Sequence, residues 1–453
     1  MRALAGLLAL LSAALGQQPP RRALLLVSID GMGADYLLKT DEYQLKIPVL
    51  RRLMRDGARA SGVTGVLPTV TYASHTTLLT GASPAKHGIY NNSTFDPLGR
   101  NSNGWYWYAE DIRVPTLWQA ASQAGYVTGS ISWPVSVGAA GVRYLIPEYW
   151  RAAPEEDIKL VRALSTPGIL QELEKSAGKY VVDLDKALPA DWARTRYAAA
   201  LLREKGVRFL TLHLGAVDHV EHASGPYSPE SFAALEEIDR MLAVLEESLE
   251  AAAPGAAICI VSDHGFARTD TLLSLNAAFA RAGLITPNPN RSSRSSTVNA
   301  WRAQAWSSAG SAAIMLKDPK DEKTRARVEA LLKELAADPA NGIVKILDRR
   351  QIAEMGGPPD AAFFVDVKPG FVIVSGTEGP LLRTVRTGGA HGYSPEHPEL
   401  LASFIFAGPG VKKGLDLGRI DMRSIAPTLA GFLEVPLPSA ELPPLDLAGA
   451  GSR

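Results

Sequence analysis

Three apolar runs, each leading into an acidic residue, constrain the fold of this chain more than any other feature. The runs cover residues 23–28, 207–214 and 256–261, and the acids beyond them are Asp30, Asp218 and Asp263. Near-continuous apolar runs of this length are typical of strands covered on both faces, as in a parallel sheet. The sequence therefore predicts buried strands with a carboxylate beyond the carboxyl end of each.

Helical patterns separate these runs, notably over residues 115–125 and 229–251. In the second pattern, apolar residues recur every three or four positions, which is the spacing of one helix face. Alternating strands and helices predict a doubly wound α/β sandwich, with a central, mostly parallel sheet and helices on both of its faces. In such folds the functional groups collect beyond the carboxyl ends of the strands, where the three aspartates fall.

The chain has 453 residues, of which 46% are apolar, so a single large catalytic domain can form a sizeable core. We expect that domain over residues 23–435, followed by a proline-rich C-terminal tail over residues 436–453. Loop or small-subdomain insertions are expected near residues 93–113, 147–195 and 285–311, where polar, aromatic or proline-punctuated segments interrupt the pattern.

The first 16 residues have the pattern of a cleaved signal peptide: one positive charge, a short apolar stretch and small residues near its end. We therefore expect an exported protein, periplasmic or extracellular, with no membrane span in the mature chain. Cys259 is the single cysteine, so no intrachain disulfide can form, and its apolar surroundings predict a buried, inert thiol.

Overall charge favours neither nucleic acid nor an anionic membrane as a partner, because Lys+Arg and Asp+Glu both number 47. A small anionic substrate must then be attracted locally. The run over residues 68–75 offers a hydroxyl nucleophile, Thr71, set between Asp30 and the pair Asp263-His264. A threonine hydroxyl is nearly inert at neutral pH, and a bound dication is one of the few groups that activate it.

Further metal-ligand candidates occur in two other places. Asp218 and His222 are four residues apart, so one helical turn can direct both at one ion, and His391 lies in a glycine-rich loop. The whole set contains three carboxylates and three imidazoles, a mixed O/N donor set that suits zinc. Two dications bring about four positive charges, which three aspartates and a threonine alkoxide nearly cancel.

Taken together and in order, these motifs resemble the type I phosphodiesterase/nucleotide pyrophosphatase family, part of the alkaline phosphatase superfamily. The resemblance runs from about residue 23 to 434 and rests on Ser28-Ile29-Asp30-Gly31, Pro68-Thr69-Val70-Thr71-Tyr72, Thr80-Gly81, His87-Gly88-Ile89-Tyr90-Asn91-Asn92, Asp218-x-x-x-His222, Ser262-Asp263-His264-Gly265 and His391-Gly392. It implies an alkaline-phosphatase-like sandwich.

The resemblance also implies a role for each matching residue. Thr71 would be the nucleophile, and Asn92 would donate a hydrogen bond to a phosphoryl oxygen. One metal would be held beside Thr71 by Asp30, Asp263 and His264, and a second by Asp218, His222 and His391. The chain departs from the family pattern at Ala73-Ser74-His75, where members often have Pro-Asn-His, and at His219, an extra imidazole that makes the assignment of His222 ambiguous.

Three aromatic positions are candidates for contact with the substrate. Tyr72 adjoins the nucleophile, and Trp133 lies in the segment Ser132-Trp133-Pro134. The cluster over residues 105–108 could stack a nucleobase or pack an insertion onto the main body. His213 lies inside an expected strand and is predicted to be a core histidine with its hydrogen bonds satisfied.

We therefore expect a two-zinc hydrolase that cleaves phosphodiester or pyrophosphate bonds of nucleotides or related small molecules through a phosphothreonine intermediate. The alternatives are a phosphomonoesterase or phosphonate hydrolase on the same scaffold, or a non-catalytic metal-binding relative. A monoester dianion needs additional cationic contacts, and the Lys-x-Arg pair of monoesterase relatives is replaced here by Ser132-Trp133-Pro134. Arg143 or Lys86 could substitute for that pair in space. The motifs leave the oligomeric state open.

Overall fold

The protein is described by a computed structural model, which covers residues 22–449 except 102–103, 152, 183–186 and 289–296. The predicted signal peptide, residues 1–16, lies outside the described residues. Within the described part of the chain, no helix is long and apolar enough to cross a membrane.

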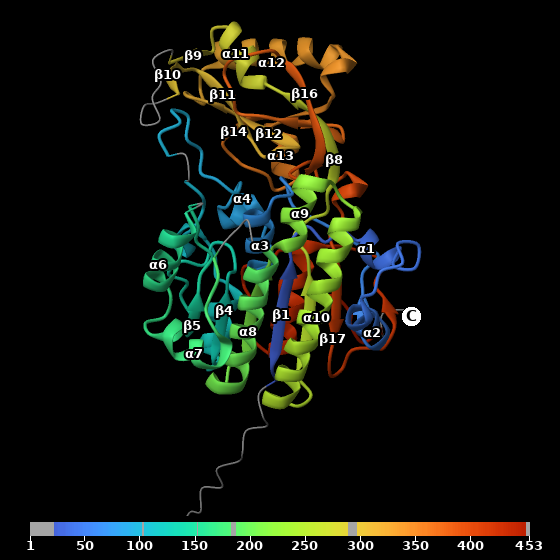
Figure 1. The fold of residues 1–453 in the computed structure, drawn as a ribbon. Helices are drawn as coiled ribbons and strands as arrows, with labels where there is room; N and C mark the ends of the chain where they lie inside the picture. The colour runs from blue at the N-terminus through green and yellow to red at the C-terminus, as the bar shows by residue number, and fades with distance from the viewer. Residues whose placement is uncertain (1–21, 102–103, 152, 183–186, 289–296, 450–453) are drawn as a thin grey trace, which may run out of the picture.

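An eight-stranded sheet forms the centre of the larger lobe (Figure 1). Its strands, in spatial order, are β18 (Leu415–Asp416), β2 (Ala58–Arg59), β17 (Phe404–Ala407), β7 (Ala257–Val261), β1 (Leu24–Ile29), β6 (Phe209–Leu214), β4 (Thr128–Ile131) and β5 (Tyr144–Ile146). The five strands from β7 to β5 are parallel, and β17 pairs with β7 in the antiparallel direction. The predicted α/β fold with a mostly parallel central sheet is therefore confirmed.

The three central strands correspond to the three apolar runs. Leu24 of β1 pairs with Phe209 of β6 and with Ala257 of β7, so the strands are in register and end at the same edge. Their side chains are buried because both faces of the sheet are covered. Cys259 lies inside β7, and its burial raises the pKa of the thiol well above the usual value.

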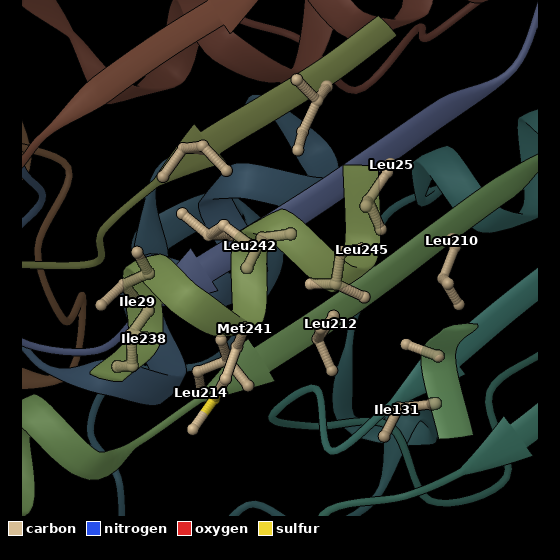
Figure 2. Close-up of a cluster of buried hydrophobic side chains, with 14 of the residues drawn as sticks. Leu25, Ile29, Ile131, Leu210, Leu212, Leu214, Ile238, Met241, Leu242 and Leu245 are labelled. Atoms are coloured by element: carbon tan, nitrogen blue, oxygen red, sulfur yellow. The ribbon is translucent and has the colours of Figure 1, made fainter. Parts of the chain in front are cut away.

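One face of the sheet packs against a set of helices that includes the long helix α10 (Pro229–Ala252). Figure 2 shows Ile238, Met241, Leu242 and Leu245 packed against strand side chains such as Ile29 and Leu212. The other helices with side chains in this core are α1 (Asp35–Leu38), α2 (Pro48–Asp56), α6 (Pro154–Leu164), α7 (Ile169–Ala177), α8 (Ala187–Lys205) and α9 (Ala216–Ser224).

The opposite face is covered by α3 (Thr71–Thr80), α5 (Leu117–Gln123) and α14 (Ile425–Leu433). Leu437, Leu445 and Leu447 of the C-terminal tail also pack against this core, so the described part of the tail runs along it. The short helix α4 (Pro84–His87) and the paired strands β3 (Gly62–Thr64) and β19 (Arg419–Asp421) complete this lobe.

A second lobe lies beyond the carboxyl end of β1 and has its own apolar core (Figure 1). It comprises β8 (Ala267–Leu273), α11 (Leu275–Arg281), β9 (Ile285–Pro287), β10 (Val298–Trp301), β11 (Ala303–Ser307), β12 (Ser311–Leu316), α12 (Glu322–Ala337), β13 (Ile343–Asp348), α13 (Arg349–Glu354), β14 (Ala361–Val367), β15 (Gly370–Ile373) and β16 (Leu382–Ala390). The insertion expected near residues 285–311 is thus one part of a longer segment, residues 267–390.

Candidate active site

The candidate metal ligands come from four places that meet beyond the carboxyl ends of the central strands. Asp30 follows β1, and Asp263-His264 follows β7. Asp218 and His222 both lie on α9, which begins just after β6. His391 follows β16 and so comes from the second lobe. The parallel register of β1, β6 and β7 explains why the first three groups converge.

Asp30, Asp263 and His264 form one compact group, with one potential ligand atom from each lying within 4.8 Å of the others. The Nε2 atom of His264 is 3.1 Å from Oδ2 of Asp263 and 3.5 Å from Oδ1 of Asp30. It is also 3.4 Å from Oγ1 of Thr71. The nucleophile candidate therefore lies at this group.

A second group forms around Asp218. Its Oδ1 atom is 3.5 Å from Nε2 of His222 and 3.7 Å from Nε2 of His391. His391 stacks on His264 with ring centroids 3.7 Å apart, so the two groups are neighbours. The structure thus brings all six predicted ligands together with Thr71. The extra imidazole, His219, lines the same cavity.

Each of the three ligand imidazoles is oriented by a backbone carbonyl. The Nδ1 atoms of His222, His264 and His391 lie 3.2 Å from the carbonyl oxygens of Gly389, Gly265 and Thr69, respectively. A carbonyl oxygen only accepts hydrogen bonds, so each Nδ1 carries a proton, and in the neutral ring Nε2 is then the nitrogen with the free lone pair. A backbone or carboxylate acceptor on the outer nitrogen is the usual support of a metal-binding histidine.

The three candidate ligand carboxylates each have a buried oxygen atom that is available to a cation. Asp30 Oδ1, Asp218 Oδ1 and Asp263 Oδ2 are buried and have no hydrogen-bond partner among the described residues. Burial and the charges of Asp263 and Asp218 raise the pKa of Asp30 well above its usual value, and burial likewise raises the pKa of Asp218. Buried, unpaired, mutually repelling carboxylates are costly, and bound cations relieve that cost. The donor set therefore fits two divalent metal ions.

Two of the candidate ligand imidazoles, those of His264 and His391, are held in the neutral form that metals bind. Burial, followed by the charge of His222, lowers the pKa of His264 to about 3. Burial, followed by the charges of His264 and His222, lowers the pKa of His391 well below its usual value. Neutral imidazole nitrogens beside carboxylates are typical of zinc sites.

Thr71 is the first residue of α3, at the end of the helix where the dipole favours an anion. The side chain of Asn92 accepts a hydrogen bond from the Tyr72 backbone N–H at 2.9 Å through Oδ1. This contact directs the Asn92 amide NH₂ group away from the helix, and Asn92 lines the cavity beside Thr71. The arrangement suits a hydrogen-bond donor to a phosphoryl oxygen.

Aromatic side chains form one wall of the cavity. Tyr72, Trp105 and Trp150 line it, and Trp105 contacts both of the other rings at centroid distances of 5.2 Å and 4.6 Å. Trp107 is buried behind Trp105 and stacks on it. The aromatic cluster of residues 105–108 therefore both packs the insertion and contributes Trp105 to the cavity.

The structure places Trp133 differently from the sequence prediction. Its side chain is fully buried, packs edge-on against His75 at 4.9 Å and is absent from the cavity lining among the described residues. The residue belongs to a core cluster between sheet and helices, because its loop turns the ring toward the protein interior. A direct substrate contact by Trp133 is therefore contradicted by its position.

The proposed substitutes for the missing Lys-x-Arg pair also lie elsewhere. Arg143 packs over the ring of Tyr144, and Lys86 donates to the carbonyl of Ser439. Instead, Arg194 of α8 lines the cavity, oriented by a 2.8 Å hydrogen bond to the buried Asp191. Asp191 in turn accepts the backbone N–H groups of Gly215 and Ala216 at the start of α9.

Sequence reasoning also missed Glu148 and the position of His213. His213 is buried with both ring nitrogens bonded, as predicted for a core histidine, but its partners are Asp30 and Glu148. Glu148 lines the cavity and follows the short apolar strand β5. An acid directly beyond an apolar run was therefore the available signal, the same one that identified Asp30.

Comparison with known proteins agrees with this geometry. The sequence profile of the family described as type I phosphodiesterase/nucleotide pyrophosphatase matches residues 24–394, which include all six candidate ligands and Thr71. The chain belongs to this family.

Relatives in the type I phosphodiesterase/nucleotide pyrophosphatase family are moderately similar in sequence. Human ectonucleotide pyrophosphatase/phosphodiesterase family member 5 is 32% identical over 133 residues, covering 27% of this chain and 26% of that protein. Venom phosphodiesterase 2 of Crotalus adamanteus is 28% identical over 235 residues, covering 50% of this chain and 24% of its own length. The matched regions therefore span about a quarter of these relatives.

Solved structures of the family share the fold over nearly the whole chain. Murine ectonucleotide pyrophosphatase/phosphodiesterase 5 superposes with a TM-score of 0.64 at 19% identity, covering 93% of this chain and 97% of that one. An inactive threonine-to-alanine variant of the same murine protein, in complex with AMP, gives a TM-score of 0.63. The alkaline-phosphatase-like architecture implied by the motifs is thus confirmed.

Proposed function

We propose that this protein is a two-metal phosphodiesterase/nucleotide pyrophosphatase that cleaves phosphodiester or pyrophosphate bonds of nucleotides or related small molecules. The observation that carries the proposal is the position of Thr71 Oγ1, 3.4 Å from His264 Nε2, at the group formed by Asp30, Asp263 and His264. Bound dications, with zinc the ion best suited to these donors, would activate the hydroxyl and neutralise phosphate charge.

Thr71 and Asn92 would carry out the steps that the metals do not. The Thr71 oxygen attacks phosphorus, and the bond from phosphorus to the leaving group breaks, with the electron pair departing on the leaving oxygen. Asn92 donates to a phosphoryl oxygen, and the start of α3 offers a favourable dipole for the anion. Water then attacks the phosphothreonine and regenerates the Thr71 hydroxyl.

Nucleotides are the favoured substrate class because Trp105 and Trp150 offer flat apolar surfaces beside the nucleophile. The related murine structure in complex with AMP supports this choice. The names of the relatives, which include ectoenzymes and venom phosphodiesterases, support action outside the cytoplasm, in the periplasm or extracellular space.

A substrate comparison tests the proposal. Purified protein loaded with zinc should turn over bis-p-nitrophenyl phosphate faster than p-nitrophenyl phosphate, and it should release nucleoside monophosphate from a dinucleoside phosphate or nucleoside triphosphate. The reverse order of rates would support a phosphomonoesterase, whereas two bound zinc ions without turnover of any ester would support a binding protein.

The position of Arg194 is the one observation that favours the phosphomonoesterase alternative. Arg194 is the only lysine or arginine that lines the cavity within the described residues, so an additional phosphate charge has a cation available. We expect Arg194→Ala to lower kcat/KM more for p-nitrophenyl phosphate than for bis-p-nitrophenyl phosphate, since a monoester carries the larger charge. An equal loss on both esters would indicate that Arg194 acts only through α8 and Asp191.

A further inference from the structure

A buried hydrogen-bonded chain connects a candidate metal ligand to the substrate wall. His213, near the end of β6, lies with Nε2 2.9 Å from Oδ2 of Asp30 and Nδ1 3.0 Å from Oε2 of Glu148. The other oxygen of Glu148, Oε1, accepts a 3.0 Å hydrogen bond from the hydroxyl of Tyr72. The order is therefore Asp30, His213, Glu148, Tyr72, which ends one residue from Thr71.

The contacts of His213 fix which atoms donate. Its Nδ1 atom also lies 3.0 Å from the carbonyl oxygen of Ser132, which only accepts, so Nδ1 must carry a proton. Nε2 faces a carboxylate oxygen and donates to it when Asp30 is ionised. Each neighbour of the ring is an acceptor, so the contacts favour one ring orientation and oppose a flipped or rotated one.

The hydrogen bond between His213 and Asp30 gives the two carboxylate oxygens of Asp30 different roles. Oδ2 is occupied by His213, while Oδ1 is buried without a partner and lies 3.5 Å from Nε2 of His264. Without His213, either oxygen could turn toward the metal group, and the carboxylate would lose its fixed geometry. Groups that orient a metal ligand in this way typically change metal affinity by about 10–100-fold when removed.

Glu148 makes the chain a link between two functions. It comes from the segment after β5, within the 147–195 insertion, and it lines the cavity. With one oxygen it holds His213, and with the other it holds Tyr72, whose ring contacts Trp105. A disturbance at Tyr72 in the aromatic wall is therefore three hydrogen bonds away from Asp30.

We infer that His213 and Glu148 are positioning residues that hold Asp30 in the orientation needed to bind the divalent cation beside Thr71, and that Glu148 couples this orientation to Tyr72. The inference rests on the proposed function only in assuming that Asp30, Asp263 and His264 bind a metal. It assigns a purpose to the buried His213 and to Glu148, whose side chain is 11% exposed, both outside the six candidate ligands.

Zinc titration of the metal-free protein against a chromogenic chelator tests this inference without any substrate. We expect His213→Gln to weaken one of two zinc-binding steps by about 10–100-fold, because glutamine has one donating nitrogen where the histidine ring has two at separate positions. Asp30→Asn should abolish the same step and thereby identify it. Glu148→Gln should weaken that step less than His213→Gln, and Tyr72→Phe, which removes one hydrogen bond of Glu148, should weaken it least, by about twofold. An unchanged zinc step in Tyr72→Phe would overturn the coupling to Tyr72.

A matched control separates positioning from simple loss of a buried histidine. His87 is also fully buried, is bonded to Thr77 and the Ile89 backbone, and makes no hydrogen bond to the six candidate ligands among the described residues. His87→Gln should lower the melting temperature and leave both zinc affinities within twofold. Wild-type zinc affinities in His213→Gln would overturn the inference, and so would an equal weakening of both steps in the His87 and His213 variants.

The test can still be interpreted if one variant does not fold or if the protein has no esterase activity. If His213→Gln does not fold, Glu148→Gln tests the same link from the cavity side, and its unchanged zinc binding would overturn the inference. If the wild-type protein binds two zinc ions but hydrolyses no ester, the proposed function fails while the titration still decides the role of His213.

Discussion

The two halves of the ligand cluster are built on different supports. The half beside Thr71 uses Asp30, Asp263 and His264, which follow β1 and β7 and are essentially buried, with His264 and Asp263 both at 0% exposure. The other half uses Asp218 and His222 on α9 and His391 from the second lobe, and the His222 side chain is 46% exposed. One half is fixed by the central sheet, and the other closes only where two lobes meet.

This difference suits two chemical tasks. A nucleophile must be held in fixed geometry before the substrate arrives, and strand ends inside a packed core provide that. Groups that face departing or entering molecules need access to solvent, and the half on α9 has it. We therefore expect substitutions in the buried half to change chemistry and stability together, and those in the open half to change mainly metal affinity.

The largest expected effect comes from Thr71, the proposed nucleophile beside the buried half. Thr71→Ala should lower kcat by roughly 10³-fold or more, because Thr71 is the only serine or threonine among the described residues that line the cavity. Zinc content, measured on the same preparation by atomic absorption, should stay at the wild-type value. Thr71→Ser keeps a hydroxyl and should recover part of the rate, so near-normal turnover by the alanine variant would contradict the assignment.

Asp263→Asn and His222→Ala compare one ligand from each half. Both should lose metal and most activity, but they should differ in the metal-free protein. Oδ1 of Asp263 accepts the backbone N–H groups of Gly31 and His264, which asparagine can retain, while its amide nitrogen can donate to His264. Removing one of three repelling carboxylates should then raise the melting temperature of metal-free Asp263→Asn by about 2 °C or more.

The exposed partner should behave differently. Metal-free His222→Ala should melt within about 1 °C of the wild type, because an accessible imidazole contributes little to the core. Differential scanning calorimetry in the presence of a chelator measures both values. If both variants shift the metal-free melting temperature equally, the contrast between a buried and an open half is wrong.

The contact of β16 in the second lobe with α9 in the larger lobe can be disturbed by adding a single methyl group. A Cβ at Gly389 of β16 would lie 2.5 Å from the carbonyl oxygen of Glu221 on α9, closer than real contacts allow. Gly389→Ala should therefore push β16 from α9, displace His391 and the carbonyl that orients His222, and weaken one zinc step by about 10-fold. Gly431→Ala, where a Cβ meets nothing within 4 Å, is the control and should leave zinc affinity unchanged.

The smallest expected effect concerns an ion pair outside the ligand cluster. His397 Nε2 lies 2.7 Å from Asp366 Oδ2 in the second lobe, and this hydrogen bond raises the pKa of His397 above its usual value. A raised folded-state pKa stabilises the protein at pH values below that of unfolded histidine, about 6.5, and the gain disappears as the pH rises through the folded-state pKa.

His397→Gln should therefore lower the free energy of unfolding by about 1 kcal/mol near pH 5.5 and by less near pH 8. Urea denaturation of both proteins in a chelating buffer gives the difference at each pH. A loss that is equal at the two pH values would show that His397 contributes packing only.

Sequence reasoning succeeded where one local rule decided the position of a residue. Acids directly beyond apolar runs locate Asp30 and Asp263 at strand ends, and the four-residue spacing locates Asp218 and His222 on one helix. It failed where tertiary packing decides. The indole of Trp133 can face either the cavity or the core with the same local sequence, and the core placement occurs.

The second lobe shows the same limit. Most side chains of its strands β13 and β16 are exposed or only partly buried, and polar residues interrupt both strands, so neither produces a continuous apolar run. The sequence therefore predicted only the polar hairpin near residues 285–311, rather than the whole segment from 267 to 390. His391, which depends on that segment, was located by its glycine-rich motif.

The burial of Cys259 has a practical consequence. As the sole thiol of the chain, enclosed inside β7, it should remain inert to maleimide dyes while the protein is folded. Cysteines introduced at the exposed positions Leu160 and Val344 would then be labelled alone, one on each lobe. Energy transfer between such a pair would report directly whether the lobes separate when zinc is withdrawn.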